Sequence, residues 1–155
     1  MPDRVVDASV MAALAFLESR AEEARDLLRN ATLFAPEIFP YELASVALKK
    51  TRDLPSGRFD IASRMRDALS LGVQLVPIEP VELLELALET NLTIYDAAYL
   101  QTARRLGCPL ITFDARLARY ARRITRALSR DAGMHCATST RSIPIPTRTI
   151  RRMIR

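Results

Sequence analysis

The sequence predicts an α/β fold in which a parallel sheet of four to five strands is flanked by helices on both faces, an α/β/α sandwich. Short apolar segments alternate along the chain with longer segments whose apolar residues recur at helical spacing. The short segments are apolar at consecutive positions, which is typical of strands buried on both faces. Strands separated by helices favour parallel pairing.

The strand segments are short and rich in aliphatic residues. The first ends in Asp7, and the last leads directly into Asp114. Pro36 follows the second segment, where a residue without an N–H group can end the pairing. The predicted strands are residues 4–7, 32–35, 73–77 and 109–113.

Helix start and stop signals separate these strands. Pro40 suits the first turn of a helix, and Thr93 is expected to cap another helix with Asp96 at its third position. Gly72 and Gly107 are expected to end helices, and residues 54–57 are expected to form a loop. The predicted helices are residues 12–17, 18–30, 41–52, 60–71, 81–89 and 94–107, and an apolar helical stripe continues from Leu117 to Leu128.

The composition is that of a soluble globular protein. Hydrophobic residues make up 49% of the 155 positions and charged residues 26%, which suits one domain with a real core. No apolar run approaches the roughly 20 residues that cross a bilayer. Asp3, Arg4 and Asp7 interrupt the first apolar stretch, which argues against a signal peptide. We therefore expect a cytoplasmic protein with no membrane association.

The net charge of +5 is unevenly distributed. Residues 1–120 hold 14 basic and 17 acidic side chains, whereas residues 121–155 hold nine arginines and one acid. We therefore expect a folded domain over residues 1–130 and a basic, flexible tail over residues 131–155. Such a tail suits contact with phosphate groups, although a solvated extension without a role is the favoured explanation.

The sequence disfavours a zinc site, because it has few cysteine and histidine residues and none at zinc-binding spacing. Cys108 and Cys136 lie far apart, no CxxC motif is present, and His135 is the only histidine. We expect both thiols to be reduced.

Four acids occupy positions that can meet at one edge of the predicted sheet. Asp7 and Asp114 follow the first and last strands, where sites form in open parallel sheets. Asp96 lies in the first turn of the helix before the last strand, and Glu42 lies near the start of the helix after the second strand. The sequence therefore predicts a cluster of four carboxylates.

Such a cluster needs a cation, because packed carboxylates repel one another. Oxygen ligands without histidine or thiolate select Mg²⁺ or Mn²⁺, and one or two such ions serve phosphate chemistry. Taken singly, Asp96 could be only a helix cap, and Glu42 could be a solvated helix residue with Glu37 close by.

Four segments carry a resemblance to a known family. They are Val5–Ser9, Pro36–Glu42, Tyr95–Leu100 and Leu110–Asp114. In this order they resemble the four motifs of PIN-domain ribonucleases, over roughly residues 4–121. The nearest likeness is to the VapC-type toxins of bacterial toxin–antitoxin pairs.

This resemblance implies cleavage of RNA that depends on Mg²⁺ or Mn²⁺. Ser9 and Thr112 match hydroxyl residues that orient carboxylates in such sites, although both could be ordinary strand-end hydroxyls. The resemblance also implies an antitoxin partner and a homodimer. The residues that it assigns to metal binding and to orienting the attacking water are Asp7, Glu42, Asp96 and Asp114.

Three departures from the family pattern are visible. Many relatives have an asparagine three residues after the motif glutamate, where this chain has Ser45. We find no clear fifth strand after Asp114, and the tail after residue 130 matches nothing in the family.

Two other functions remain open. A catalytically silent PIN-fold module could bind RNA or a partner protein, although the presence of all four acids argues against it. A phosphatase with an aspartyl nucleophile would favour an acid two residues after Asp7, where this chain has Ser9. No GxxxxGK phosphate loop is present either.

Overall fold

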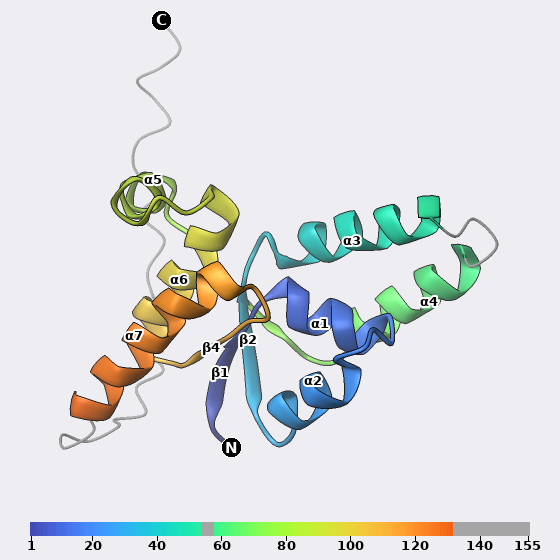
Figure 1. The fold of residues 1–155 in the computed structure, drawn as a ribbon, viewed down its shortest axis with the longest axis horizontal. Coiled ribbons are helices and arrows are strands. Elements are labelled where there is room, and N and C mark those ends of the chain that lie inside the picture. The colour runs from blue at the N-terminus through green and yellow to red at the C-terminus, as the bar shows by residue number, and fades with distance from the viewer. Residues whose placement is uncertain (54–57, 132–155) are drawn as a thin grey trace, which may run out of the picture.

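The computed structural model describes residues 1–53 and 58–131, and a parallel sheet lies at its centre (Figure 1). The strands lie in the order β3-β2-β1-β4, and all neighbouring pairs are parallel. Val5 pairs with Phe34 on one side and with Leu110 on the other, so β1 is an inner strand. The strands are β1 (Asp3–Val6), β2 (Thr32–Pro36), β3 (Gln74–Val76) and β4 (Leu110–Ile111).

The helices of the described chain are α1 (Ala8–Ala15), α2 (Ala21–Leu28), α3 (Phe39–Asp53), α4 (Arg58–Leu69), α5 (Pro80–Thr90), α6 (Ile94–Leu106) and α7 (Ala115–Asp131). Figure 1 shows α6 and α7 on one side of the sheet and α1 and α2 on the other. Helices α3 and α4 pack together as a pair that extends away from the sheet (Figure 1). This layered arrangement confirms the predicted α/β class.

The core is built around β1 and α6. Val5 and Val6 are completely buried in the sheet. Residues 97–103 of α6 are all buried, and the alanines among them let the helix pack closely against β1 and β2. A helix that is apolar on all sides is expected between two layers, and α6 lies between the sheet and its neighbours α5 and α7. Asp96, in the first turn of α6, is therefore held by a rigid element.

The caps of α6 follow the sequence signals. The Thr93 hydroxyl accepts a hydrogen bond from the Asp96 N–H at 3.1 Å, which satisfies one unpaired amide of the first turn. Gly107 ends the helix with φ of +63°, a left-handed conformation that costs glycine little. Both predicted caps are confirmed, and together they set the point at which the chain returns to β4.

Strand β4 is shorter than the sequence predicts. Residues 109–113 were expected, but only Leu110 and Ile111 pair with β1. The amides of Phe113 and Asp114 donate to side chains, Phe113 N–H to the Ser9 hydroxyl and Asp114 N–H to the Thr112 hydroxyl. The ladder ends early because the hydrogen bonds of this segment are used at the sheet edge.

Other boundaries also move by a few residues: the helix expected over residues 12–17 is α1 at Ala8–Ala15, and the helix expected over residues 60–71 is α4 at Arg58–Leu69. The helix expected from residue 18 begins at Ala21, because Arg20 takes the N-cap position. Strand β2 includes Pro36, and the following Glu37 N–H donates to the Val76 carbonyl, so the parallel pairing continues past the proline.

Several predictions lie outside the described residues. They concern the loop over residues 54–57 and most of the basic tail, including His135 and Cys136. No fifth strand is present in residues 1–53 and 58–131. The division into a domain over 1–130 and a tail over 131–155 stays a prediction. Within the same two ranges, no helix has the length and apolar character to cross a membrane.

The packing of α3 can be tested with two leucines of the same helix. Leu43 is completely buried, whereas Leu48 is 51% exposed. Because Leu43→Ala leaves a cavity, we expect it to lower the free energy of unfolding by about 2 to 5 kcal/mol in urea denaturation. Leu48→Ala is the matched control and should change it by less than about 1 kcal/mol. Equal losses in the two variants would contradict this packing of α3.

Candidate active site

Asp7 lies where β1 ends and α1 begins, and it is only 7% exposed. Its N–H donates to the Ile111 carbonyl of β4 at 3.0 Å. Its carbonyl accepts from Val10 and Met11 in the first turn of α1. The backbone of this buried acid is therefore held by β4 and by α1 at once.

Two hydroxyl groups hold the Asp7 carboxylate. Oδ2 accepts from Ser9 Oγ at 2.5 Å and from Thr112 Oγ1 at 2.7 Å. Each hydroxyl also accepts a backbone N–H, from Phe113 at 3.1 Å and from Asp114 at 3.0 Å. Because each hydroxyl oxygen accepts an amide hydrogen, its own hydrogen is directed at the carboxylate. Ser9 and Thr112 thus occupy the orienting positions that the sequence indicated.

Glu42 reaches the same region from the first turn of α3. Its Oε2 accepts a hydrogen bond from the hydroxyl of Tyr99, a residue of α6 that is 1% exposed. The nearby Glu37 behaves differently, because it is exposed and its Oε1 accepts the Ile78 N–H at 3.4 Å. The structure therefore separates these two glutamates: Glu37 is exposed, whereas Glu42 is half-buried beside Tyr99.

Asp96 combines a cap contact with a place beside the other acids. Its Oδ2 accepts from the Thr93 hydroxyl at 2.8 Å. Its charge also contributes to the raised pKa values of Asp7 and Glu42. The capping role and the role in the acid cluster are both present in one residue.

Burial and mutual repulsion disfavour the charged forms of these acids. Burial raises the pKa of Asp7, the hydrogen bonds from Ser9 and Thr112 lower it, and the charge of Asp96 raises it. Burial, together with the charges of Asp7 and Asp96, raises the pKa of Glu42 to about 6, although the hydrogen bond from Tyr99 lowers it. No lysine or arginine contributes to either shift. Three carboxylates therefore share a site without a compensating cation from the described chain.

Asp114 lies at the same sheet edge but has a second task. Its Oδ1 accepts the Leu117 N–H at 2.7 Å, which caps the start of α7. Its side chain is exposed, and its charge is not among the causes of the shifts at Asp7 and Glu42. Its link to the cluster is its N–H, which donates to the Thr112 hydroxyl that holds Asp7.

The donor set suits a hard cation in chemistry, because it consists of carboxylate oxygens. The described part of the chain contains no group of three or more His, Cys, Asp or Glu residues already arranged to hold a metal ion. Bringing three acids onto one ion therefore requires side-chain movement, for example of Glu42 away from the Tyr99 hydroxyl.

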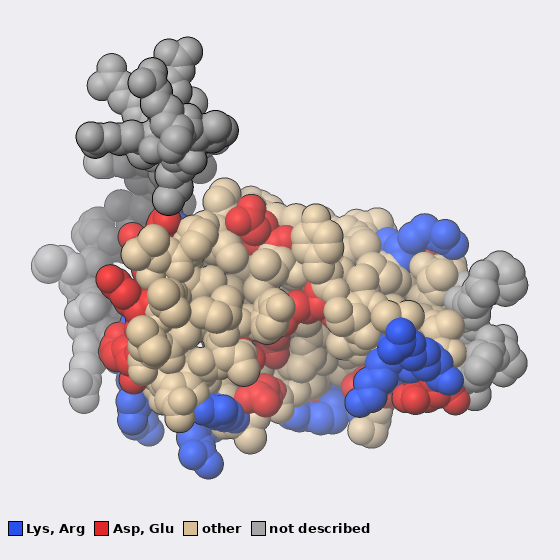
Figure 2. Space-filling model, turned by 90° about the horizontal axis from the view of Figure 1, so that it is seen from above, with Lys and Arg blue, Asp and Glu red and all other residues tan. Residues whose placement is uncertain are grey.

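Two hollows flank the acids. One, of about 390 Å³, is lined by Ile38, Tyr41, Glu42, Ser45 and Tyr95. The other, of about 480 Å³, is lined by Ser9, Ala12, Glu18, Ser19, Arg20, Val46, Phe113 and Asp114. Figure 2 shows acidic side chains along the middle of this face, and the basic side chains lie nearer its edges.

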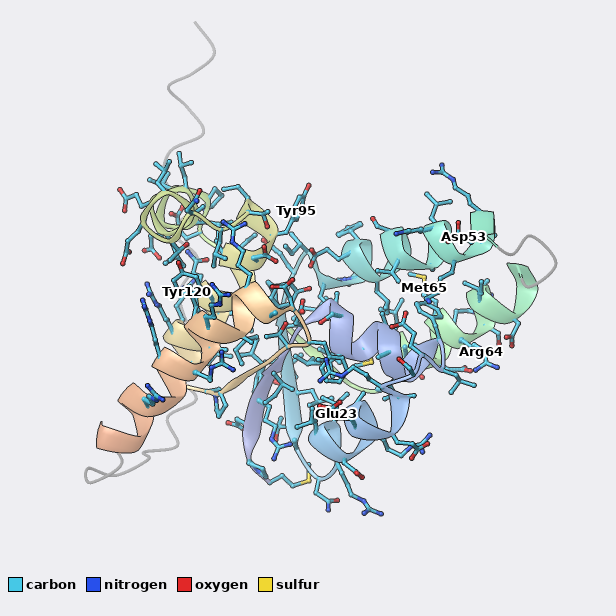
Figure 3. The ribbon with its side chains drawn as sticks, viewed as in Figure 1. Glu23, Asp53, Arg64, Met65, Tyr95 and Tyr120 are labelled. Carbon is cyan, nitrogen blue, oxygen red and sulfur yellow. The ribbon has the colours of Figure 1, made fainter. Side chains whose placement is uncertain are left out.

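Side chains at the first hollow explain one departure from the family pattern. Tyr95 extends from the start of α6 toward the start of α3 (Figure 3). Ser45 donates to the Tyr41 carbonyl of its own helix at 3.0 Å. The Ser45 hydroxyl therefore donates within α3 and not to Glu42.

The sequence prediction missed two residues at this site. Tyr99 could have been found, because it lies three residues after Asp96 and so on nearly the same face of α6. Arg20 gave no local signal. Only the fold brings it to the hollow beside Asp114, where its guanidinium lies 3.6 Å from the centre of the Phe113 ring.

Asp7 follows the inner strand β1, and Asp114 follows the edge strand β4, so both lie where open α/β sheets place their ligand sites. The fold and the grouped acids are those of an α/β protein with a carboxylate site at this edge. Comparison with known proteins gives the family. The PIN domain matches residues 4–123, and the chain belongs to the PIN-domain family.

Curated relatives place the chain near one branch of that family. Ribonuclease VapC3 of Pyrobaculum aerophilum is 36% identical over 122 residues, which cover 74% of this chain and 91% of the relative. Ribonuclease VapC12 of Mycobacterium tuberculosis is 32% identical over 115 residues, covering 74% and 88%. Ribonuclease VapC9 of the same species is 35% identical over 116 residues, covering 74% and 87%.

Solved structures share the fold. PAE2754 from Pyrobaculum aerophilum superposes with a TM-score of 0.62 at 24% identity, covering 86% of this chain and 91% of that one. VapC20 of Mycobacterium tuberculosis, a toxin that cleaves the sarcin–ricin loop, superposes with a TM-score of 0.56 at 20% identity, covering 75% and 93%.

The raised pKa values predict that stability falls as the pH rises. Glu42 has a pKa of about 6 in the folded protein against 4.5 ordinarily. The folded state therefore holds this proton more tightly, so its stabilising effect is present below pH 4.5 and lost above about pH 6. In EDTA at pH 7, Glu42→Gln should raise the free energy of unfolding by about 1 to 2 kcal/mol. Urea denaturation at pH 4.5 and pH 7 measures the difference.

Glu85→Gln on the exposed face of α5 is the matched control, and we expect no pH-dependent gain from it. A Glu42→Gln variant that is less stable than the wild-type protein at pH 7 would show that repulsion and burial do not dominate at this site.

Removing the Tyr99 hydroxyl should move the pKa of Glu42 further upward, because this hydrogen bond lowers it. We expect Tyr99→Phe to raise the pKa above about 6, measured by carbon NMR of the side-chain carboxyl in the metal-free protein. Tyr120→Phe removes a hydroxyl that donates to the Thr90 carbonyl, and it should leave Glu42 unchanged. Identical titration curves in the two variants would exclude the contact between Tyr99 and Glu42.

Proposed function

We propose that this protein is a cytoplasmic endoribonuclease that depends on Mg²⁺ or Mn²⁺ and serves as the toxin of a toxin–antitoxin pair. It hydrolyses RNA phosphodiester bonds. Membership of the PIN family and the identity of its curated relatives as VapC ribonucleases support the class of reaction. The observation that carries the proposal is the group formed by Asp7, Glu42 and Asp96, whose charges oppose one another without a cation from the described chain.

The mechanism assigns metal binding to Asp7, Glu42, Asp96 and Asp114. A bound divalent ion supplies Lewis-acid chemistry, because it polarises the phosphate and makes water a better nucleophile. Hydrolysis then breaks a P–O bond, with the water oxygen joining phosphorus and a proton passing to the leaving oxygen.

The residues around the acids position them for this task. Ser9 and Thr112 hold one oxygen of Asp7, and Tyr99 holds one oxygen of Glu42. Asp114 keeps one oxygen on the Leu117 N–H, so its other oxygen is the one available to an ion or to a water molecule. Fixed carboxylates reduce the reorganisation that an incoming ion requires.

The proposed partners follow from the family. An RNA strand is the substrate, an antitoxin protein blocks the site, and a second copy of the chain completes a homodimer. The alternative is a catalytically silent PIN module that binds RNA or a protein. The grouping of three acids favours the enzyme, because a binding module gains nothing from placing Asp96 and the half-buried Glu42 beside the buried Asp7.

Cleavage of a mixed RNA pool tests the proposal. The purified protein, freed of any bound partner, should cut RNA with Mg²⁺ or Mn²⁺ and not with EDTA. Asp7→Asn and Asp96→Asn should each lower the rate by roughly a hundredfold or more, because they weaken metal binding. Asp26→Asn, an exposed acid of α2, is the control and should cut at the wild-type rate. Folded wild-type protein that binds RNA without cutting it would favour the silent module.

A further inference from the structure

Arg20 is held in one orientation by two contacts. Its Nε and Nη2 donate to the two carboxylate oxygens of Glu23, each at 2.7 Å. Its guanidinium also stacks 3.6 Å from the centre of the Phe113 ring. Within the described residues, Nη1 donates no hydrogen bond, and 47% of the side chain is exposed. The Arg20 guanidinium is therefore held in one plane, and its Nη1 group still has N–H donors for a ligand.

This cation belongs to the hollow beside the acids. Arg20, Phe113, Ser9 and Asp114 line it together. Phe113, on which the guanidinium stacks, donates its N–H to Ser9, and Ser9 donates to Asp7. The contacts run without a gap from Arg20 to the most buried carboxylate of the site.

Arg20 is the basic residue that lines this hollow. The acidic side chains that line it are Glu18 and Asp114. Glu18 is paired with Lys50 at 2.7 Å, so both of those charges are compensated. Arg20 is likewise paired with Glu23, and no salt bridge within the described residues compensates Asp114. An anion that enters the hollow could therefore be bound only by the donors of Arg20 that Glu23 leaves open.

We propose that Arg20 binds a phosphate of the RNA strand next to the bond that is cut, with Phe113 and Glu23 fixing the plane of its guanidinium. This inference rests on the proposed ribonuclease function. An acidic site repels a polyanion, so a substrate needs a cation at its entrance that does not neutralise the metal ligands. Arginine suits this role, because its planar donors match two phosphate oxygens and it keeps its charge.

A surface ion pair alone would not explain the arrangement. Exposed salt bridges contribute little to stability, and α2 contains a second one of the same kind. Arg25 pairs with Glu22 at 2.5 Å in the same helix, but it does not line the hollow. Arg25 is therefore a matched control for the charge, the helix and the lost ion pair.

Binding to RNA tests the role of Arg20. The probe is a labelled, short single-stranded RNA pool of mixed sequence, and the background is Asp7→Asn, so that binding is read without cleavage. In fluorescence anisotropy, Arg20→Ala should weaken affinity roughly tenfold, and Arg25→Ala less than about twofold. The slope of log affinity against log salt should fall by about 0.7 for Arg20→Ala, as expected when one phosphate contact is lost. Arg20→Lys should recover part of the affinity.

Kinetic measurements on variants of the active enzyme distinguish a loss of RNA binding from a loss of stability. Arg20→Ala should raise KM for RNA while its melting temperature stays equal to that of Arg25→Ala. Equal RNA affinities for Arg20→Ala and Arg25→Ala would overturn the inference while leaving the ribonuclease function standing. A wild-type protein that neither binds nor cuts RNA would overturn both.

Discussion

The buried carboxylate of Asp7 is the feature on which the rest of the site depends. It joins the end of an inner strand to the first helix, and its N–H extends the pairing between β1 and β4. The hydroxyls of Ser9 and Thr112 join two distant parts of the sequence through one carboxylate oxygen. A charged group in this position is costly unless it is hydrogen-bonded, so its partners are fixed along with it.

Holding acids close to the buried Asp7 lowers the stability of the folded protein, but the same grouping suits the binding of a cation. Burial raises the pKa values of Asp7 and Glu42, the charge of Asp96 raises both further, and the charge of Asp7 adds to the increase at Glu42. A divalent cation would reverse the sign of this interaction, because repelling carboxylates become attracting ligands. Relief of this repulsion would therefore strengthen the binding of a cation.

Much of the fold follows from local signals in the sequence. Thr93 and Gly107 mark both ends of α6, and the apolar run around Val5 and Val6 marks the central strand. The length of β4 could not be predicted, because the amides of Phe113 and Asp114 bond to hydroxyls rather than to a strand. The apolar pattern shows where a strand can form. Whether side-chain hydroxyls take up the amides of that strand depends on tertiary contacts, which the pattern does not show.

The site was predicted less completely than the fold, for a physical reason. Asp7 and Asp96 are placed by a strand end and a helix start, which topology brings to one edge. The choice of Glu42 over Glu37 depends on the Tyr99 hydroxyl, and the place of Arg20 depends on the Phe113 ring. Asp114 follows the last strand as expected, but its service as the cap of α7 appears only in three dimensions.

The shortness of β4 also affects how the molecule can meet other chains. Within the described residues the sheet ends at β4, with two residues, and at β3, with three. Long exposed edges invite a strand from another molecule, whereas edges this short offer few backbone groups for such pairing. The hydrogen bonds that end β4 early therefore also protect the sheet against edge-to-edge aggregation. Association with another protein is directed to the helices instead.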